Sequence, residues 1–176
     1  MTGDTDAEQL QPLSSQQRAF PPVIDGGLII CKHDCRMPTD LNEIIAEFAD
    51  LDPRERLEML LDYCENLPEL PPDLEQERLA GEHRIQECQT PVFMWIKLAN
   101  GMVDMQAWVA PEAPTVKGFV GILRDPFHCQ PPEPVLNTPP DLLKQLGLDV
   151  ALGMTRARGL SAILFYLRKQ VERAAS

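Results

Sequence analysis

The feature that most constrains the fold is the pair Asn100-Gly101, which separates two runs rich in β-branched and aromatic residues. Asn-Gly is the dipeptide best suited to a two-residue hairpin turn, because both turn positions need a positive φ. The flanking runs, residues 92–98 and 102–109, have the length of ordinary strands. The sequence therefore predicts a β-hairpin, with residues 84–86 as a candidate short third strand at its edge.

The sequence before the hairpin predicts two helices followed by a proline-rich stretch. Thr39 or Asp40 can cap the first helix, and Asp52, Pro53 and Glu55 form a capping arrangement for the second. Each helix carries its apolar residues on one face: Leu41, Ile44, Ile45 and Phe48 on the first, and Leu57, Leu60, Leu61, Cys64 and Leu67 on the second. The prolines that follow end the second helix.

After the hairpin, the run TVKGFVGILR predicts a buried helix, in which Gly118 and Gly121 allow a neighbour to approach closely. The next segment, residues 125–137, is interpreted as a loop. A short helix is expected to start after Thr138 and to stop at Gly147.

The last helix is expected to open at Thr155, with its basic residues toward the C-terminal end, where the helix dipole favours cations. Its apolar face consists of Leu160, Ile163, Leu164, Leu167 and Val171.

This order of helices, hairpin and helices indicates the α+β class. We expect a small antiparallel sheet built on the hairpin and packed against the N-terminal and C-terminal helices. Residues 1–38 carry scattered Pro, Gly, Ser and Gln without a sustained period and are expected to form a flexible extension. Residues 39–176 then form one domain. With 176 residues, 44 % of them hydrophobic, the chain can bury a substantial core.

The net charge of −11 is concentrated in the first half of the chain. Residues 1–88 hold seven Lys and Arg against 20 Asp and Glu, whereas residues 89–176 hold nine against seven. Such acidity argues against nucleic acid as a partner and favours a protein with a basic patch, although a surface kept charged for solubility is an alternative. No run approaches the roughly 20 apolar residues that span a bilayer, so we expect a cytoplasmic protein.

In a reducing cytosol the five cysteines are expected to remain mostly as thiols. Cys64 falls on an apolar helix face and is interpreted as a core residue, and Cys129 is given no role. Cys31, His33 and Cys35 resemble the start of a zinc site, but a structural site needs four ligands and the usual CxxC pair is missing. Surface thiols are the alternative interpretation.

Cys88 lies where a polar run meets the first strand, and it is followed by the turn-type residues Gln89, Thr90 and Pro91. We therefore expect its thiol on a loop at the edge of the domain, where it can meet another protein. A loop cysteine taken alone is more often incidental than reactive, and no hydrolase triad surrounds this one.

A reactive thiol must be ionised, and a free cysteine has a pKa of about 8.5. Positive charge can come from His83 or Arg84 nearby in sequence, or from Arg156 and Arg158 if the start of the last helix folds back beside the loop. The carboxylate of Glu87 acts in the opposite direction.

The segment RIQECQTPVFMW resembles the signature of the SufE-like sulfur acceptors, the partners of cysteine desulfurases in iron–sulfur cluster assembly. Cys88, Gln89 and Val92 match that signature, and Thr90 and Phe93 stand for its Ser and Trp. The resemblance spans roughly residue 40 to the C-terminus. Its downstream matches are Val116, Lys117 and Gly118 in the middle helix, and Leu152, Thr155, Arg156, Gly159 and Leu160 near the end.

Three features depart from the family pattern. Glu87 replaces the Gly before the cysteine, which removes backbone freedom and adds charge at the loop. Pro111, Glu112 and Ala113 stand where the family has Ser-Asp-Ala, and the segment CKHDC in the extension is outside the pattern.

The resemblance implies a SufE/IscU-like fold and a sulfur relay. In that relay a SufS-like, pyridoxal-phosphate-dependent desulfurase forms a persulfide on its own cysteine, and Cys88 takes the terminal sulfur and carries it to an iron–sulfur scaffold complex. The protein is then an activator of the desulfurase rather than an enzyme, with no cofactor of its own. Gln89 and Arg156 are implied to position the loop or to contact the partner.

Two alternatives remain open from the sequence. The first is a docking module of the same fold that no longer transfers sulfur, for which Glu87 is the motivating feature. The second is a zinc-binding protein that uses Cys31, His33 and Cys35.

Overall fold

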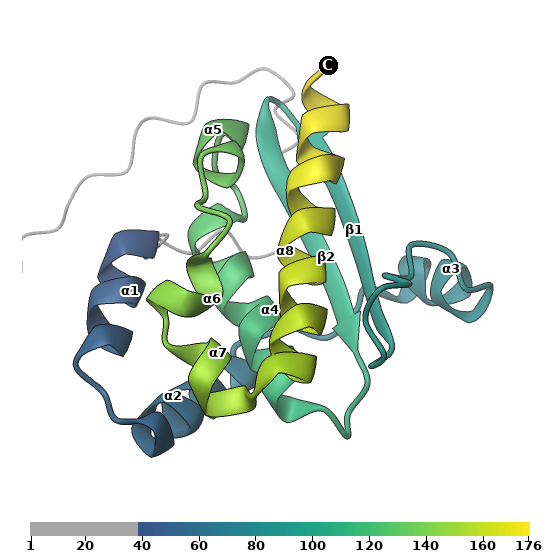
Figure 1. Ribbon diagram of the computed structural model, residues 1–176. Helices are drawn as coiled ribbons and strands as arrows, with labels where there is room; N and C mark the ends of the chain where they lie inside the picture. The colour runs from purple at the N-terminus through teal and green to yellow at the C-terminus, as the bar shows by residue number, and fades with distance from the viewer. Residues whose placement is uncertain (1–38) are drawn as a thin grey trace, which may run out of the picture.

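The computed structural model describes residues 39–176 and has one two-stranded antiparallel sheet among helices (Figure 1). The expected extension over residues 1–38, and with it Cys31, His33 and Cys35, lies outside the described residues. The elements are α1 (Leu41–Ala49), α2 (Pro53–Glu65), the 3₁₀ helix η1 (Pro72–Leu74), α3 (Glu75–Leu79), β1 (Val92–Ala99), β2 (Met102–Val109), α4 (Pro114–Phe127), α5 (Pro132–Leu136), α6 (Leu142–Gln145), α7 (Leu148–Leu152) and α8 (Met154–Ala175). The expected α+β class is confirmed.

The hairpin forms as predicted, and its register runs from Val92 opposite Val109 to Ala99 opposite Met102. Asn100 and Gly101 have φ of 54° and 77°, so both turn positions take the positive φ that a tight hairpin requires. The third strand expected at residues 84–86 is reduced to a single bridge between Arg84 and Phe93. A segment this short pairs once and then leaves the sheet edge.

Helix starts follow the sequence closely because capping depends on neighbouring residues. The Asp40 side chain accepts a hydrogen bond from the backbone N–H of Asn42 at 2.8 Å. Asp52 accepts from the N–H of Glu55, and the Glu55 carboxylate accepts in return from the N–H of Asp52, which completes a capping box. The two upstream helices therefore begin where the sequence predicts.

The helices α2 and α4 pack closely against each other. Gly118 and Gly121 of α4 lie directly against the backbone of α2, where a Cβ at either position would overlap the carbonyl oxygen of Leu60 or Tyr63. The prediction that these glycines permit a close approach is confirmed.

The two faces of the hairpin are covered by different segments. One face joins the main core, in which α8 packs on β1 and α4 packs on β2. The other carries a small aromatic cluster of Phe93 and Trp95 that packs against Leu74 of η1. Figure 1 shows α8 running along the hairpin and α3 projecting at the opposite edge.

Several predicted boundaries are wrong. Residues 125–137 are not one loop, because α4 continues to Phe127 and α5 follows at Pro132. Prolines are compatible with the first turn of a short helix, which made this segment look irregular. The segments η1, α3 and α7 were not predicted. On α2 the face is also shifted, because Leu61 is 42 % exposed while Tyr63 packs against the core.

The start and the apolar face of α8 agree closely with the sequence prediction. It starts one residue before the predicted Thr155, and all five residues of its predicted apolar face are buried. Among the helices of residues 39–176, none is both long and apolar enough to cross a membrane.

Candidate functional site around Cys88

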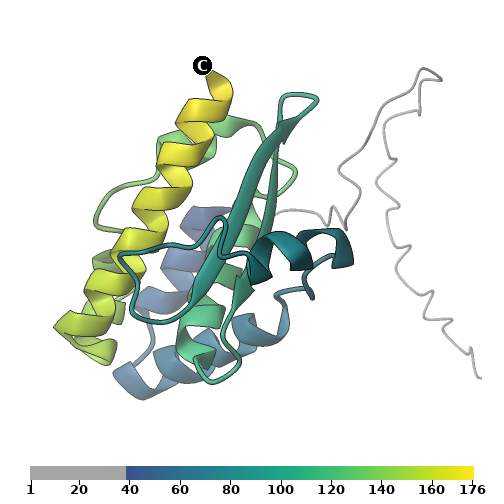
Figure 2. The same cartoon turned by 90° about the vertical axis from the view of Figure 1, so that its right-hand side faces the viewer.

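The thiol of Cys88 lies in the segment that connects the bridge at Arg84 to β1. The sequence predicts a loop at the domain edge, but the side chain is only 4 % exposed. Figure 2 shows this segment reaching across to the first half of α8. The side chain is buried there at the wall of a surface pocket rather than deep inside the protein.

Thr90 and Gly159 define the immediate surroundings of the sulfur. The backbone and the side chain of Thr90 both hydrogen-bond to Cys88, which lowers the pKa of the thiol, but burial raises it more. The net direction is upward, so the thiol at rest is more protonated at neutral pH than an ordinary cysteine. A Cβ on Gly159 of α8 would lie 3.5 Å from the sulfur, so the helix backbone forms one side of its seat.

The pocket beside Cys88 has a volume of about 390 Å³ and brings together residues from three parts of the chain. The loop contributes Glu87, Cys88 and Gln89, α4 contributes Val116, and the start of α8 contributes Arg156 and Arg158. Gln89 and Arg156 are exposed at its mouth. All three residues that the sequence singled out, Cys88, Gln89 and Arg156, therefore share one pocket.

The two basic residues nearest in sequence to Cys88 take other positions. His83 pairs with Glu77, with 3.4 Å between Nε2 and Oε2, and Arg84 lines a neighbouring groove. The positive charge in the thiol's pocket comes instead from Arg156 and Arg158. The alternative in which the start of the last helix folds back beside the loop is the arrangement observed.

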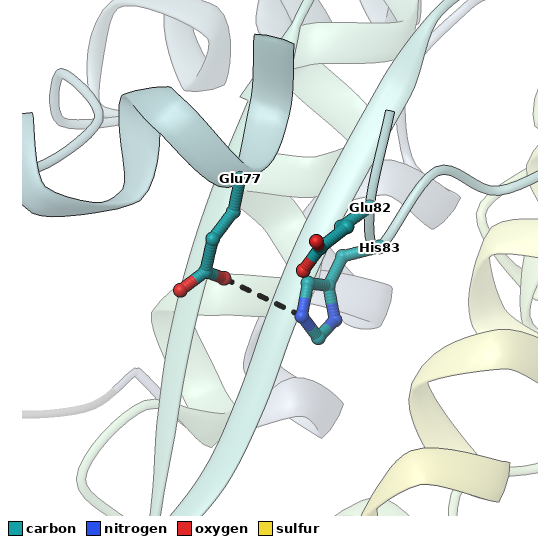
Figure 3. Close-up of side chains that lie close together, drawn as sticks. All are labelled: Glu77, Glu82 and His83. Atoms are coloured by element: carbon teal, nitrogen blue, oxygen red, sulfur yellow. Dashed lines mark ion pairs between the residues drawn. The ribbon is translucent and has the colours of Figure 1, made fainter. Parts of the chain in front are cut away.

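A second group of ligand-type side chains lies close together (Figure 3), and none of its residues lines the Cys88 pocket. The donor atoms of Glu77, Glu82 and His83 lie within 4.8 Å of one another. The His83 imidazole lies against the Glu77 carboxylate, and the indole Nε1 of Trp95 donates a hydrogen bond to Glu77 at 2.6 Å. We interpret the group as a polar contact that fixes the loop to the sheet.

The other described cysteines differ from Cys88. Cys64 is a free thiol but only partly buried, so its interpretation as a core residue is wrong in degree. Cys129 is disulfide-bonded, whereas Cys64 and Cys88 are free thiols.

The comparison with protein families decides the assignment. The model of the family described as "SufE: Fe-S metabolism associated domain" matches residues 42–171. The chain belongs to the SufE family. The resemblance seen in the sequence is thereby confirmed, and it places the chain in iron–sulfur metabolism, among accessory sulfur-transfer proteins rather than classical enzymes.

Similar proteins agree with this assignment. An uncharacterized SufE-like protein of Mycobacterium tuberculosis is 30 % identical over 139 residues, which are 78 % of this chain and 95 % of the relative. An uncharacterized SufE-like protein of Synechocystis is 31 % identical over 124 residues, which are 70 % of this chain and 74 % of the relative. The solution structure of a hypothetical protein from Thermus thermophilus superposes with a TM-score of 0.67 at 36 % identity, over 80 % of this chain and 98 % of that one.

Thr90 and Gly159 are the site residues whose roles the sequence did not reveal. Both fall on positions that match the SufE pattern, which was the available signal. Their contacts with the sulfur depend on how the loop folds over α8, and this is a long-range property that no local pattern contains.

Proposed function

We propose that this SufE-family protein is a sulfur acceptor that takes persulfide sulfur onto Cys88 from a cytoplasmic, SufS-like cysteine desulfurase. It stimulates that enzyme and delivers the sulfur to an iron–sulfur scaffold complex. The observation that carries the proposal is the shared pocket of Cys88, Gln89 and Arg156 in a chain that matches the family model over residues 42–171.

The transfer step conserves atoms and electrons. The Cys88 thiolate attacks the terminal sulfur of the donor's cysteine persulfide, and a new S–S bond forms on Cys88. The S–S bond of the donor persulfide breaks, and the donor's cysteine leaves as a thiolate. Any proton on the terminal sulfur stays on that sulfur as it moves to Cys88. One S–S bond forms for the one that breaks, so neither an oxidant nor a reductant is needed.

The buried resting position of Cys88 suits the storage of the received sulfur better than the attack on the donor's persulfide. Burial raises the pKa of Cys88, so attack requires the loop to expose the thiol or a partner to supply positive charge. After transfer, the same pocket shelters the persulfide from soluble reductants. The 390 Å³ beside the sulfur leaves room for one more sulfur atom.

Two neighbours have roles in this proposal. Arg156 stabilises negative charge on the sulfur, because a guanidinium forms strong hydrogen bonds with anions. Its position at the first turn of α8 is one that the helix dipole disfavours for a cation. Gln89 is exposed beside Cys88 and contacts the partner or holds the loop.

The test is the intact mass of the protein after anaerobic incubation with a cysteine desulfurase, its pyridoxal phosphate and L-cysteine. We expect the mass to increase by one sulfur atom, located on the peptide that contains Cys88. The Cys88→Ser variant should show neither the adduct nor stimulation of the desulfurase, whereas the control Cys64→Ser should show both. Absence of any adduct on the wild-type protein contradicts the proposal.

A second candidate is a docking module that binds the desulfurase without accepting sulfur. It is favoured by the burial of Cys88 and by Glu87, whose charge lines the same pocket. This function predicts normal stimulation by the Cys88→Ser variant, so the same experiment separates the two candidates.

A further inference from the structure

A groove on the outer face of α8 adjoins the Cys88 pocket and has a chemical character of its own. Its volume is about 210 Å³, which is below the roughly 300 Å³ at which small-molecule pockets begin. Its charged and aromatic lining is Arg84, Glu87, Phe165, Tyr166, Lys169 and Arg173. A hollow of this size accommodates a protein side chain rather than a metabolite.

Phe165 is the exposed anchor of this groove. Its side chain is 67 % exposed, although large aromatic residues are usually buried. The ammonium of Lys169, one turn further along α8, lies 6.0 Å from the centre of its ring. Aromatic residues, Phe among them, are enriched in the cores of protein interfaces.

The charge of this face is opposite to that of the whole molecule. The groove and the Cys88 pocket together are lined by Arg84, Arg156, Arg158, Lys169 and Arg173, with Glu87 as the acidic lining residue they share. The chain as a whole has a net charge of −11. An acidic surface is therefore attracted to this face and repelled by most of the rest, which orients its approach.

The position of the groove beside the Cys88 pocket indicates which protein occupies it. Because Glu87 lines both hollows, the groove adjoins the pocket at which a sulfur-donating protein must dock to reach Cys88. We propose that the groove docks an acidic segment of the sulfur-donating desulfurase, with an apolar side chain of that segment packed on Phe165. This inference rests on the proposed function.

The test is the rate of sulfur loading onto Cys88 by a purified SufS-like desulfurase, measured against the concentration of this protein. The double charge reversal Lys169→Glu with Arg173→Glu should raise the half-saturating concentration at least about tenfold, because rim charges act mainly on association. Phe165→Ala should raise it about tenfold, the size of effect expected for an interface anchor. The rate at saturation should be unchanged for both.

Matched controls come from other surfaces. Lys144→Glu reverses an exposed charge on α6, and Leu79→Ala truncates a side chain on α3 that is 64 % exposed. Both should behave as wild type. Circular dichroism and the rate of Cys88 alkylation by iodoacetamide establish that the fold and the thiol pocket are intact in every variant.

The outcomes separate the two proposals. Loading of the wild type with unchanged half-saturation in the groove variants overturns the docking site and leaves the sulfur-acceptor function standing. Failure of the wild type to load overturns both. Self-association of the wild type that the groove variants abolish, seen by sedimentation, assigns the groove to a second copy and overturns the desulfurase as its occupant.

Discussion

The contacts of two helical glycines distinguish a rigid region of this protein from a region that can rearrange. Gly118 on α4 lies against the backbone of α2 with no room for a methyl group, whereas a methyl group at Gly159 on α8 would meet the Cys88 sulfur at an ordinary contact distance of 3.5 Å. The first contact joins two fixed backbones. The second joins a helix to a side chain on a loop.

This difference teaches where the fold tolerates motion. A carbonyl oxygen within a helix cannot move without breaking the helix, so the α2–α4 pair holds one geometry. The Cys88 side chain belongs to the buried core, but it sits on a loop beside a 390 Å³ pocket, which gives it space to move into. The proposed sulfur relay needs the second property.

The largest effect is expected for Gly118→Ala. The added Cβ would overlap the Leu60 carbonyl oxygen, and overpacking of this kind costs about 3 kcal/mol of unfolding free energy, partly offset by about 1 kcal/mol of helix propensity. Urea unfolding followed by circular dichroism measures the loss. A variant as stable as wild type would show that the α2–α4 pair is not rigid.

The second effect is the pH dependence of Cys88 alkylation. Burial raises the pKa of Cys88, and the thiolate fraction below a pKa grows about tenfold per pH unit. Alkylation of the Cys88 peptide by iodoacetamide should therefore keep rising steeply through about pH 8.5, where an ordinary cysteine begins to level off. Mass spectrometry of that peptide gives the rate, and a short cysteine peptide is the reference. Levelling at the same pH as the reference would contradict the shifted pKa.

The third effect concerns the hydrogen bonds to the sulfur. Thr90→Val removes the side-chain hydrogen bond that favours the thiolate, and such a bond to a charged group contributes about 1.5–3 kcal/mol. We expect alkylation of Cys88 at neutral pH to slow by about tenfold or more. Thr155→Val changes a residue of the same pocket that is not among the groups shifting the Cys88 pKa, and it serves as the control. Equal alkylation rates in the two variants would contradict a role of Thr90 in stabilising the Cys88 thiolate.

The smallest effect is expected for Gly159→Ala. The new Cβ would meet the Cys88 sulfur at 3.5 Å, an ordinary contact distance, and alanine is favoured over glycine inside a helix. The free energy of unfolding should change by less than about 1 kcal/mol in the urea experiment used for Gly118→Ala. A loss as large as that of Gly118→Ala would mean that the Cys88 seat is as rigid as the core.

Much of the fold could be predicted from the sequence because its signals are local. The hairpin turn at Asn100-Gly101 and the capping box of Asp52 and Glu55 involve residues within a few positions of one another. The apolar face of α8 follows from helical periodicity alone. The exposure of Leu61 was mispredicted because the neighbour that α2 meets, not its own period, decides which of its apolar residues are covered.

The sequence predicted which residues form the candidate site, but it did not predict the burial or the hydrogen bonds of the thiol. The sequence singled out Cys88, Gln89 and Arg156, and the structure places them in one pocket, while the roles of these residues remain proposals. The sequence did not reveal that the Cys88 thiol is buried or that Thr90 hydrogen-bonds to this thiol. Proximity in sequence also suggested His83, whose imidazole pairs with Glu77 instead.

By itself the sequence determined the secondary structure around the hairpin, the helix starts and the residues that carry the family pattern, because each depends on short-range geometry and side-chain type. Only the tertiary structure decided that the Cys88 thiol lies buried between Thr90 and Gly159, and that Arg156 rather than His83 shares its pocket. The physical reason is that burial, pKa and access depend on groups distant in the chain, which only the packing of the loop against α8 brings together.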